Sequence, residues 1–433
     1  MTIDSRVEAR EFNTTGWVLM LLNFCVNMLW GCTFKSIGVL LPVLTDQFSA
    51  DTWIIGTVAS LTSVAADVSG LLAAPLENKF ATRWVLTMSA LMVSLGWFVV
   101  SFATSVVHIA GSLIVFVGAG MGILNVLSKA FLARHFRKNT TLAYGLSNTG
   151  NAVALLVFAP MTQLFLDTYG WRGATLLVAG VCANSIPCAA LVRVTKKSSY
   201  QPLSCSNEDE TASLETKSCH SYIGTLCAGL WKVAGFGIVF ELNFIILYLC
   251  RFSMNIAYNS WMVYFVPHLQ AKGFSPQVAA ALCVPPAIAY FIGTSVWAPF
   301  IDRGLVRCSS GIVISSLVLA ASFIVDPWVD GDVGTAVNNV LFGLSISALY
   351  TLGDILTKER FGMDRLTSVF AWVRAFGFLP RLLGGFFPGW MYDTTGTYDV
   401  AYVVIGSSSI LTLIPLVVQQ LWKSHLEKRS QSA

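Results

Sequence analysis

Long apolar runs follow one another along almost the whole chain, and short polar segments separate them. Each run holds about 20 residues or more, which is enough for an α-helix to cross the hydrocarbon core of a bilayer. The pattern therefore predicts an all-α polytopic membrane protein with twelve transmembrane helices. The predicted spans are residues 17–42, 53–75, 83–105, 109–132, 141–166, 172–193, 239–266, 277–300, 308–326, 334–357, 365–390 and 398–422.

The second six spans repeat the first six. Three sequence landmarks recur at a nearly constant separation of 224 to 226 residues. A shared offset indicates a duplicated six-helix unit, and two such units are expected to form pseudo-symmetric bundles with a binding site between them near the membrane midplane. The paired landmarks are 74–83 with 298–307, Phe136 with Phe361, and Asp167 with Asp393.

One long hydrophilic segment separates the two halves. It is rich in Ser, Thr and acidic residues, a composition typical of a disordered linker. The predicted domain boundaries are 1–16 for an N-terminal tail, 17–193 for the first bundle, 194–238 for the linker, 239–422 for the second bundle and 423–433 for a C-terminal tail.

The composition agrees with a membrane location. Hydrophobic residues make up 55% of the chain and charged residues 12%, whereas soluble domains carry roughly 25% charged residues. These values exclude an ordinary soluble enzyme, a disordered chain and a secreted disulfide scaffold. The sequence holds no zinc-ligand spacing, nucleophile motif or nucleotide-binding motif, so we expect no enzyme activity, no cofactor and no metal.

The basic residues predict the orientation of the helices. With both termini in the cytoplasm, 20 of the 27 Lys and Arg residues fall on the cytoplasmic side. Only Arg172 and Lys272 fall on the outer side, and five lie within spans. Cytoplasmic loops carry an excess of Lys and Arg, so we expect a multi-pass protein of the plasma membrane with cytoplasmic termini.

Several segments resemble the monocarboxylate transporter family (solute carrier family 16) of the major facilitator superfamily. The segment 135–153, HFRKNTTLAYGLSNTGNAV, is similar to the signature that enters the family's fifth helix. Segments 34–39, 170–174, 359–370 and 389–402 also fit the family pattern. The resemblance implies a transporter with the major facilitator fold, a small organic substrate, proton symport and a single-pass immunoglobulin-type glycoprotein as ancillary partner.

The eighth span departs from the family pattern. Proton-coupled members carry an Asp there and an Arg four residues later, and here Tyr290 and Thr294 stand at those positions. Neither residue is cationic or titrates near neutral pH. This departure predicts weak dependence of transport on the proton gradient.

Charged residues inside the spans are the first candidates for a functional site, because a charge near the bilayer centre is costly. Lys35 is expected to face a central cavity, although it could instead extend to the outer surface. Arg374 and Arg381 lie seven residues apart and therefore share one helix face. Lys35 and Arg374 together are expected to hold a substrate carboxylate, one from each bundle. Asp67, Asp354, Arg251 and Arg381 are candidates for ion pairs or a proton relay.

Polar residues and loops complete the candidate site. Tyr290, Thr294, Asn148 and Asn259 are predicted to contact the substrate, although most buried polar residues of this kind only bridge helices. The loops after spans 2 and 8 are candidates for gating loops, and simple positive-inside charge is the alternative explanation. Their charged residues are Lys79, Arg83, Asp302, Arg303 and Arg307.

The leading hypothesis is a secondary transporter for a monocarboxylate or a related carboxylated metabolite, working by alternating access. A proton-independent facilitative carrier of aromatic amino acids, creatine or thyroid-hormone-like solutes is the alternative. A non-transporting nutrient sensor is less favoured, because the linker and tails are short. Nucleic acid is not expected as a partner.

Overall fold

The computed structural model describes residues 14–136, 140–192, 236–302, 307–419 and 422. Within these ranges the chain forms helices and short turns and contains no strand, which confirms the predicted all-α fold. Residues 1–13 of the predicted N-terminal tail, the predicted C-terminal tail, most of the predicted linker and Arg303 lie outside the described residues, and residues 14–16 of the predicted tail belong to the first helix.

The first half of the chain begins with a long helix and continues through short helical connections. A 3-10 turn, Gly70–Leu72, joins α3 to α4, and a π-helical stretch, Ser112–Gly118, joins α6 to α7. The helices are α2 (Thr14–Phe48), α3 (Thr52–Ser69), α4 (Ala73–Lys79), α5 (Thr82–Val100), α6 (Val106–Gly111), α7 (Ala119–His135), α8 (Thr140–Ala183) and α9 (Ser185–Ala190).

The second half begins with a 3-10 turn, Phe236–Phe240, and a further 3-10 turn, Asp326–Trp328, follows α14. Its helices are α11 (Leu242–Ala271), α12 (Pro276–Ala281), α13 (Val284–Asp302), α14 (Cys308–Val325), α15 (Asp332–Phe376), α16 (Phe378–Thr395) and α17 (Asp399–Leu411).

Each predicted span coincides with helix in the described ranges, but two of the expected loops differ in form. Predicted spans 5 and 6 are joined within α8 by a sharp bend at Gly170, where φ is 69° and ψ is 178°. Only glycine adopts this backbone conformation readily. Predicted spans 10 and 11 share α15, and the segment 358–364 between them is helical. That segment contains no proline and mostly residues that favour helix, so its polarity alone does not interrupt the helix.

The break in predicted span 11 falls at Gly377, between α15 and α16. Pro380 lies in the first turn of α16 and has no backbone N–H to donate to the carbonyl of Phe376. The Tyr248 hydroxyl of α11 donates to that carbonyl instead, at 3.1 Å. A proline therefore divides the span, and a side chain of another helix satisfies the group that the proline leaves free.

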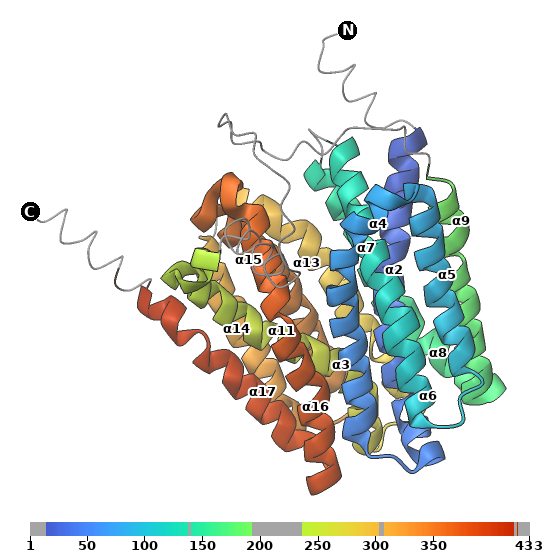
Figure 1. Ribbon diagram of the computed structural model, residues 1–433. Helices are drawn as coiled ribbons and strands as arrows, with labels where there is room; N and C mark the ends of the chain where they lie inside the picture. The colour runs from blue at the N-terminus through green and yellow to red at the C-terminus, as the bar shows by residue number, and fades with distance from the viewer. Residues whose placement is uncertain (1–13, 137–139, 193–235, 303–306, 420–421, 423–433) are drawn as a thin grey trace, which may run out of the picture.

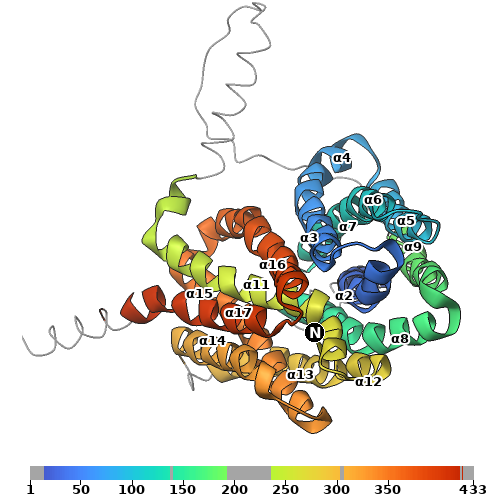
Figure 2. The same ribbon diagram turned by 90° about the horizontal axis from the view of Figure 1, so that it is seen from below.

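The helices form two groups that correspond to the two halves of the chain. Helices α2–α9 lie on the right of Figure 1 and α11–α17 on the left. Within the first group α2 packs against α7 and α8, and within the second α15 packs against α13 and α14. Figure 2 shows the groups side by side, with α3 next to α16 and α8 next to α12 and α13.

Glycines bring the helices of the two groups into close contact. A Cβ at Gly56 of α3 would overlap the carbonyl of Gly385 of α16 and the hydroxyl of Tyr264. A Cβ at Gly38 of α2 would lie 2.6 Å from the carbonyl oxygen of Val263 in α11. Such backbone approach is how helices pack in a membrane, where the hydrophobic effect drives little helix association.

Candidate functional site

The two helix groups are joined at the end that the basic residues predict to be outer. The backbone N–H of Trp53, at the start of α3, donates to Asp393 Oδ2 of α16 at 3.0 Å. Gln277 Nε2 of α12 donates to Asp167 Oδ2 of α8 at 3.1 Å. In Figure 1, α3 and α16 lie side by side at this lower end and separate toward the upper end, where α2 begins. The structure is thus closed at the predicted outer end.

Lys35 is buried where the two groups meet, with 0% of its surface exposed. Its Nζ lies 3.4 Å from the ring centroid of Trp261 in α11 and 5.4 Å from that of Phe265. Nζ also donates to the carbonyl oxygen of Trp261 at 3.4 Å. The side chain therefore does not extend to the surface, and within the described residues no carboxylate forms an ion pair with it.

The aromatic contacts offset only part of the cost of this buried charge. A cation over a desolvated aromatic ring gains about 2 kcal/mol, whereas a cation at the centre of a membrane costs at least about 2.5–3.5 kcal/mol. Trp261 is held in place by stacking on Phe342, with ring centroids 4.7 Å apart, and by donating from Nε1 to Asn339 Oδ1 at 3.4 Å. The result is a fixed, dry cation that an anion could neutralise.

An ion pair joins the two groups between α3 and α16. The guanidinium of Arg381 in α16 pairs with the carboxylate of Asp67 in α3, and the two side chains are 17% and 14% exposed. The carbonyl of Arg381 accepts hydrogen bonds from Ser60 Oγ at 2.9 Å and Asn259 Nδ2 at 2.8 Å. Asn259, predicted to contact a substrate, thus has its amide nitrogen engaged in contacts between helices.

A second ion pair lies within the second group. Arg251 of α11 pairs with Asp354 of α15. Arg251 is 11% exposed and Asp354 is 59% exposed, and Arg251 Nε is buried without a hydrogen-bond partner in the described part of the chain. Gly353 leaves room for the guanidinium, since a Cβ there would lie 2.9 Å from Nε. All four charged residues predicted as ion-pair or relay candidates therefore occur in two pairs.

The remaining candidates have varied surroundings. Asn148 is exposed, and its Oδ1 accepts from Asn27 Nδ2 at 3.2 Å. Tyr290 and Thr294 are half-buried, and the Thr294 hydroxyl donates to the carbonyl of Phe291 in its own helix at 2.9 Å. Arg374 lies in α15, but its side chain is outside the described part of the structure.

Of the predicted gating-loop residues, three are described with their side chains and are exposed. Asp302 is the last residue of α13, and its side chain lies outside the described part, as does the whole of Arg303. The exposed residues are Lys79, Arg83 and Arg307.

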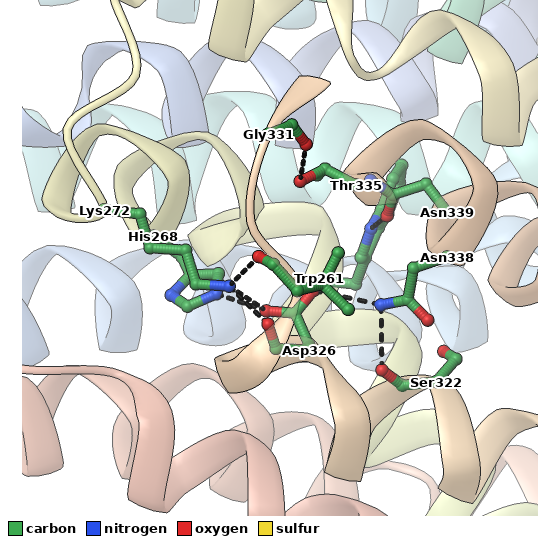
Figure 3. A network of polar contacts seen from close by, with 10 residues as sticks. Trp261, His268, Lys272, Ser322, Asp326, Gly331, Thr335, Asn338 and Asn339 are labelled. Carbon is green, nitrogen blue, oxygen red and sulfur yellow. Dashed lines mark hydrogen bonds and ion pairs between the residues drawn. The ribbon is translucent and has the colours of Figure 1, made fainter. Parts of the chain in front are cut away.

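A buried polar cluster at the predicted outer end of the second group was not found by sequence reasoning (Figure 3). His268 Nε2 of α11 lies 2.5 Å from Asp326 Oδ2, and the two side chains are 1% and 5% exposed. Lys272 Nζ lies 3.3 Å from the same carboxylate oxygen, and Asn338 Nδ2 donates to Asp326 Oδ1 at 3.1 Å. The cluster joins α11 and the 3-10 turn after α14 to α15.

A sequence signal for this cluster exists. His268 and Lys272 are four residues apart, so they share one face at the end of an apolar span. Asp326 closes another apolar span at the same end. Trp261, in contrast, gave no signal beyond being one aromatic residue among many in a membrane helix.

Helix length and composition agree with a membrane protein. Eight helical segments in the described ranges are long and apolar enough to cross a bilayer. Many large apolar side chains on the outside of the structure are exposed, including Trp84, Phe102 and Val107. Such a surface suits lipid contact.

Comparison with known proteins agrees with this architecture. Residues 19–333 match the family profile of the Major Facilitator Superfamily. Among solved structures, a D-xylose-proton symporter superimposes with a TM-score of 0.70 at 13% identity, covering 92% of this chain and 97% of that one. A POT family transporter in complex with 5-aminolevulinic acid superimposes with a TM-score of 0.68, also at 13% identity, covering 92% of this chain and 95% of that one.

Several similar curated proteins carry one family name. Monocarboxylate transporter 12 of Rattus norvegicus is 24% identical over 93% of this chain and 84% of its own length. Monocarboxylate transporter 13 of the same species is 25% identical over 92% and 89%, respectively. Monocarboxylate transporter 11 of Mus musculus is 27% identical over 90% and 84%.

Proposed function

Since this chain belongs to the Major Facilitator Superfamily and its relatives are monocarboxylate transporters, we propose that this secondary transporter carries a small monocarboxylate or related carboxylated metabolite. Transport proceeds by alternating access, in which the two bundles rock about a site between them. The transporter acts in the plasma membrane with both termini in the cytoplasm. A single-pass ancillary glycoprotein is a further partner expected from the family resemblance.

The buried cation at Lys35 carries the proposal. It lies between the bundles, is 0% exposed, and faces an aromatic side chain rather than an acid. A carboxylate that reaches Nζ would form a charge-assisted hydrogen bond in a site from which water is excluded. We expect Arg374 to be the second cation that holds the same carboxylate, from the other bundle.

The coupling ion is the point on which the alternatives differ. Tyr290 and Thr294 occupy the positions of the titratable pair of proton-coupled relatives, which favours transport without protons. Asp67 and Asp354 are the intramembrane acids that could instead relay a proton. Both have arginine partners. The alternative function, facilitative transport of an aromatic amino acid, creatine or a thyroid-hormone-like solute, draws its support from the same substitution.

Uptake into proteoliposomes tests the substrate class and the cation together. The purified protein is offered a panel of labelled monocarboxylates, amino acids and creatine at two external pH values. Loss of one charge-assisted hydrogen bond costs about 1.5–3 kcal/mol, or roughly tenfold to a hundredfold in affinity. We therefore expect Lys35→Gln and Arg374→Gln each to weaken carboxylate uptake by that factor, with little dependence on pH in the wild type.

The control is Arg172→Gln, which removes an exposed cation at the predicted outer end and should leave uptake unchanged. Wild-type affinity in Lys35→Gln would refute the proposed anchor. Uptake of creatine or aromatic amino acids, but of none of the simple monocarboxylates of the panel, would favour the alternative function. A steep rise of uptake at low external pH would refute proton-independent transport and direct attention to Asp67 and Asp354.

A further inference from the structure

Three tyrosines from three helices of the second bundle meet near Lys35. Tyr258 of α11 and Tyr350 of α15 pack edge to face, with ring centroids 5.6 Å apart. Tyr290 of α13 lies near both. We refer to Tyr258, Tyr290 and Tyr350, together with Asn151 of the first bundle, as the tyrosine subsite.

Asn151 faces this cluster from α8 and is only partly satisfied. Its Nδ2 donates to the Tyr258 hydroxyl at 3.3 Å. Its Oδ1 is buried and accepts no hydrogen bond within the described residues. Gly31 of α2 provides the space beside this oxygen, because a Cβ at that position would lie 3.1 Å from Oδ1. A buried acceptor without a donor is costly, and few occur in native proteins without a reason.

The tyrosine subsite and Lys35 belong to one interface. Gly31 precedes Lys35 by four residues in α2, and Tyr258 precedes Trp261 by three residues in α11. Both separations are close to one helical turn, so Gly31 and Tyr258, which lie against Asn151 of α8, are about 4.5–6 Å along their helices from Lys35 and Trp261. The cation and the unpaired acceptor are therefore two neighbouring parts of one surface between the bundles.

We propose that the tyrosine subsite binds a hydroxyl group of the substrate while Lys35 holds its carboxylate. This inference rests on the proposed function. A hydroxyl both donates and accepts, so it can donate to Asn151 Oδ1 and accept from a phenol. The three rings supply flat apolar surface for the part of the substrate that joins the two polar groups. This spacing selects a substrate whose hydroxyl is separated from its carboxylate by about the length of one helical turn, across a ring or a short chain. A hydroxyl on the carbon next to the carboxylate would be too close.

Benzoate and 4-hydroxybenzoate are matched probes for this spacing, because they differ only in the hydroxyl at the far end of the ring. Uptake of each labelled acid into proteoliposomes gives a ratio of kcat/KM values. One neutral hydrogen bond corresponds to roughly a threefold to tenfold effect. We expect the wild type to prefer 4-hydroxybenzoate by about that factor.

Variants identify the residues that create the preference. Tyr258→Phe and Tyr350→Phe keep the rings and remove one hydroxyl each, and Asn151→Ala removes the free acceptor. Each should bring the ratio close to one while benzoate uptake is retained. Asn184→Ala is the matched control, since Asn184 is an exposed asparagine of the same bundle, in the turn between α8 and α9, and its Nδ2 donates to carbonyls at the end of α8.

Lys35→Gln separates this inference from the function on which it rests. It should lower uptake of both acids by the same factor and leave their ratio unchanged. A wild-type ratio of one, or variants of the subsite that slow both acids equally, would overturn the subsite while leaving carboxylate transport in place. Absence of uptake of either acid, with other carboxylates transported, would also overturn it. Absence of all carboxylate uptake would refute the proposed function and the subsite together.

Discussion

Single charged side chains in this protein are compensated in different ways, and this difference is the basis for proposing Lys35 rather than an arginine as the anchor of an anion. Arg381 has the carboxylate of Asp67, and Arg251 has that of Asp354. Among the described residues, Lys35 has the rings of Trp261 and Phe265, a carbonyl oxygen and the Cys283 thiol as partners, and no carboxylate. Since each arginine already has a carboxylate partner, both arginines have less to gain from an anionic ligand than Lys35 does.

The pair between Asp67 and Arg381 gives a prediction about stability. Removing one partner of a buried pair leaves an uncompensated charge and costs about 3–5 kcal/mol. Asp67→Asn and Arg381→Gln should therefore each lower the Tm of the purified protein by several degrees. The double variant should be no less stable than either single variant, because it leaves no unpaired charge.

Thermal unfolding in detergent, followed by fluorescence, measures these shifts. Asp46→Asn is the control, as Asp46 is an exposed carboxylate at the end of α2 and should have little effect. Additive losses in the double variant would show that the two side chains act independently.

At the residue scale, a sequence singles out a residue whose type is rare in its surroundings and does not single out one whose type is common. A lysine or arginine inside an apolar span stands out, so Lys35, Arg251 and Arg381 could be found in advance. The partners of each charge depend on which helices touch, and a hydropathy pattern does not contain that information. Trp261 could not be chosen, because nothing in its local sequence distinguishes it from the chain's other tryptophans.

At the scale of elements, the polar cluster around Asp326 joins the predicted outer ends of three helices. His268 and Lys272 come from α11, Asp326 from the turn after α14, and Asn338 from α15. The carboxylate is the group that all the others contact. The loop from Asp326 to Asp332 is therefore fixed to the body of the second bundle by its first residue.

Asp326→Asn should destabilise the second bundle. The change removes a buried charge from contact with Lys272 and His268, and breaking such a buried pair costs about 3 kcal/mol or more. Asp330→Asn alters an exposed acid four residues later and should change stability by no more than about 0.5 kcal/mol. Urea or thermal unfolding of the two variants makes the comparison, and equal stabilities would show that the cluster contributes nothing.

The positions of the helices were largely predictable, because each apolar run is long and its ends are polar. The places where the helices are interrupted could not be predicted from hydropathy. The polar segment 358–364 continues α15, whereas the apolar segment around Gly377 contains the break. Polarity predicted a loop at 358–364, where the helix continues. The break at Gly377 follows instead from Pro380, which cannot donate a backbone hydrogen bond.

At the scale of the whole molecule, the charge asymmetry predicts which end faces the cytoplasm. An epitope tag inserted at Ser206, in the predicted linker, should be reached by antibody only after permeabilisation of the cells. A tag at Gly331, between α14 and α15, should be reached in intact cells. The reverse pattern would invert the orientation, and with it the conclusion that the structure is closed toward the outside.

The order of synthesis gives the burial of Lys35 a consequence for assembly in the membrane. The lysine enters the bilayer with the first helix, but the ring that covers it is at position 261, in the seventh predicted span. Until that residue has left the ribosome, the first helix carries an uncovered charge of the kind that is costly in lipid. The N-terminal half made alone should therefore insert its first helix poorly or be degraded quickly. Lys35→Leu should lengthen the half-life of that fragment in a pulse-chase measurement, and an unchanged half-life would show that the nascent helix is covered by other means.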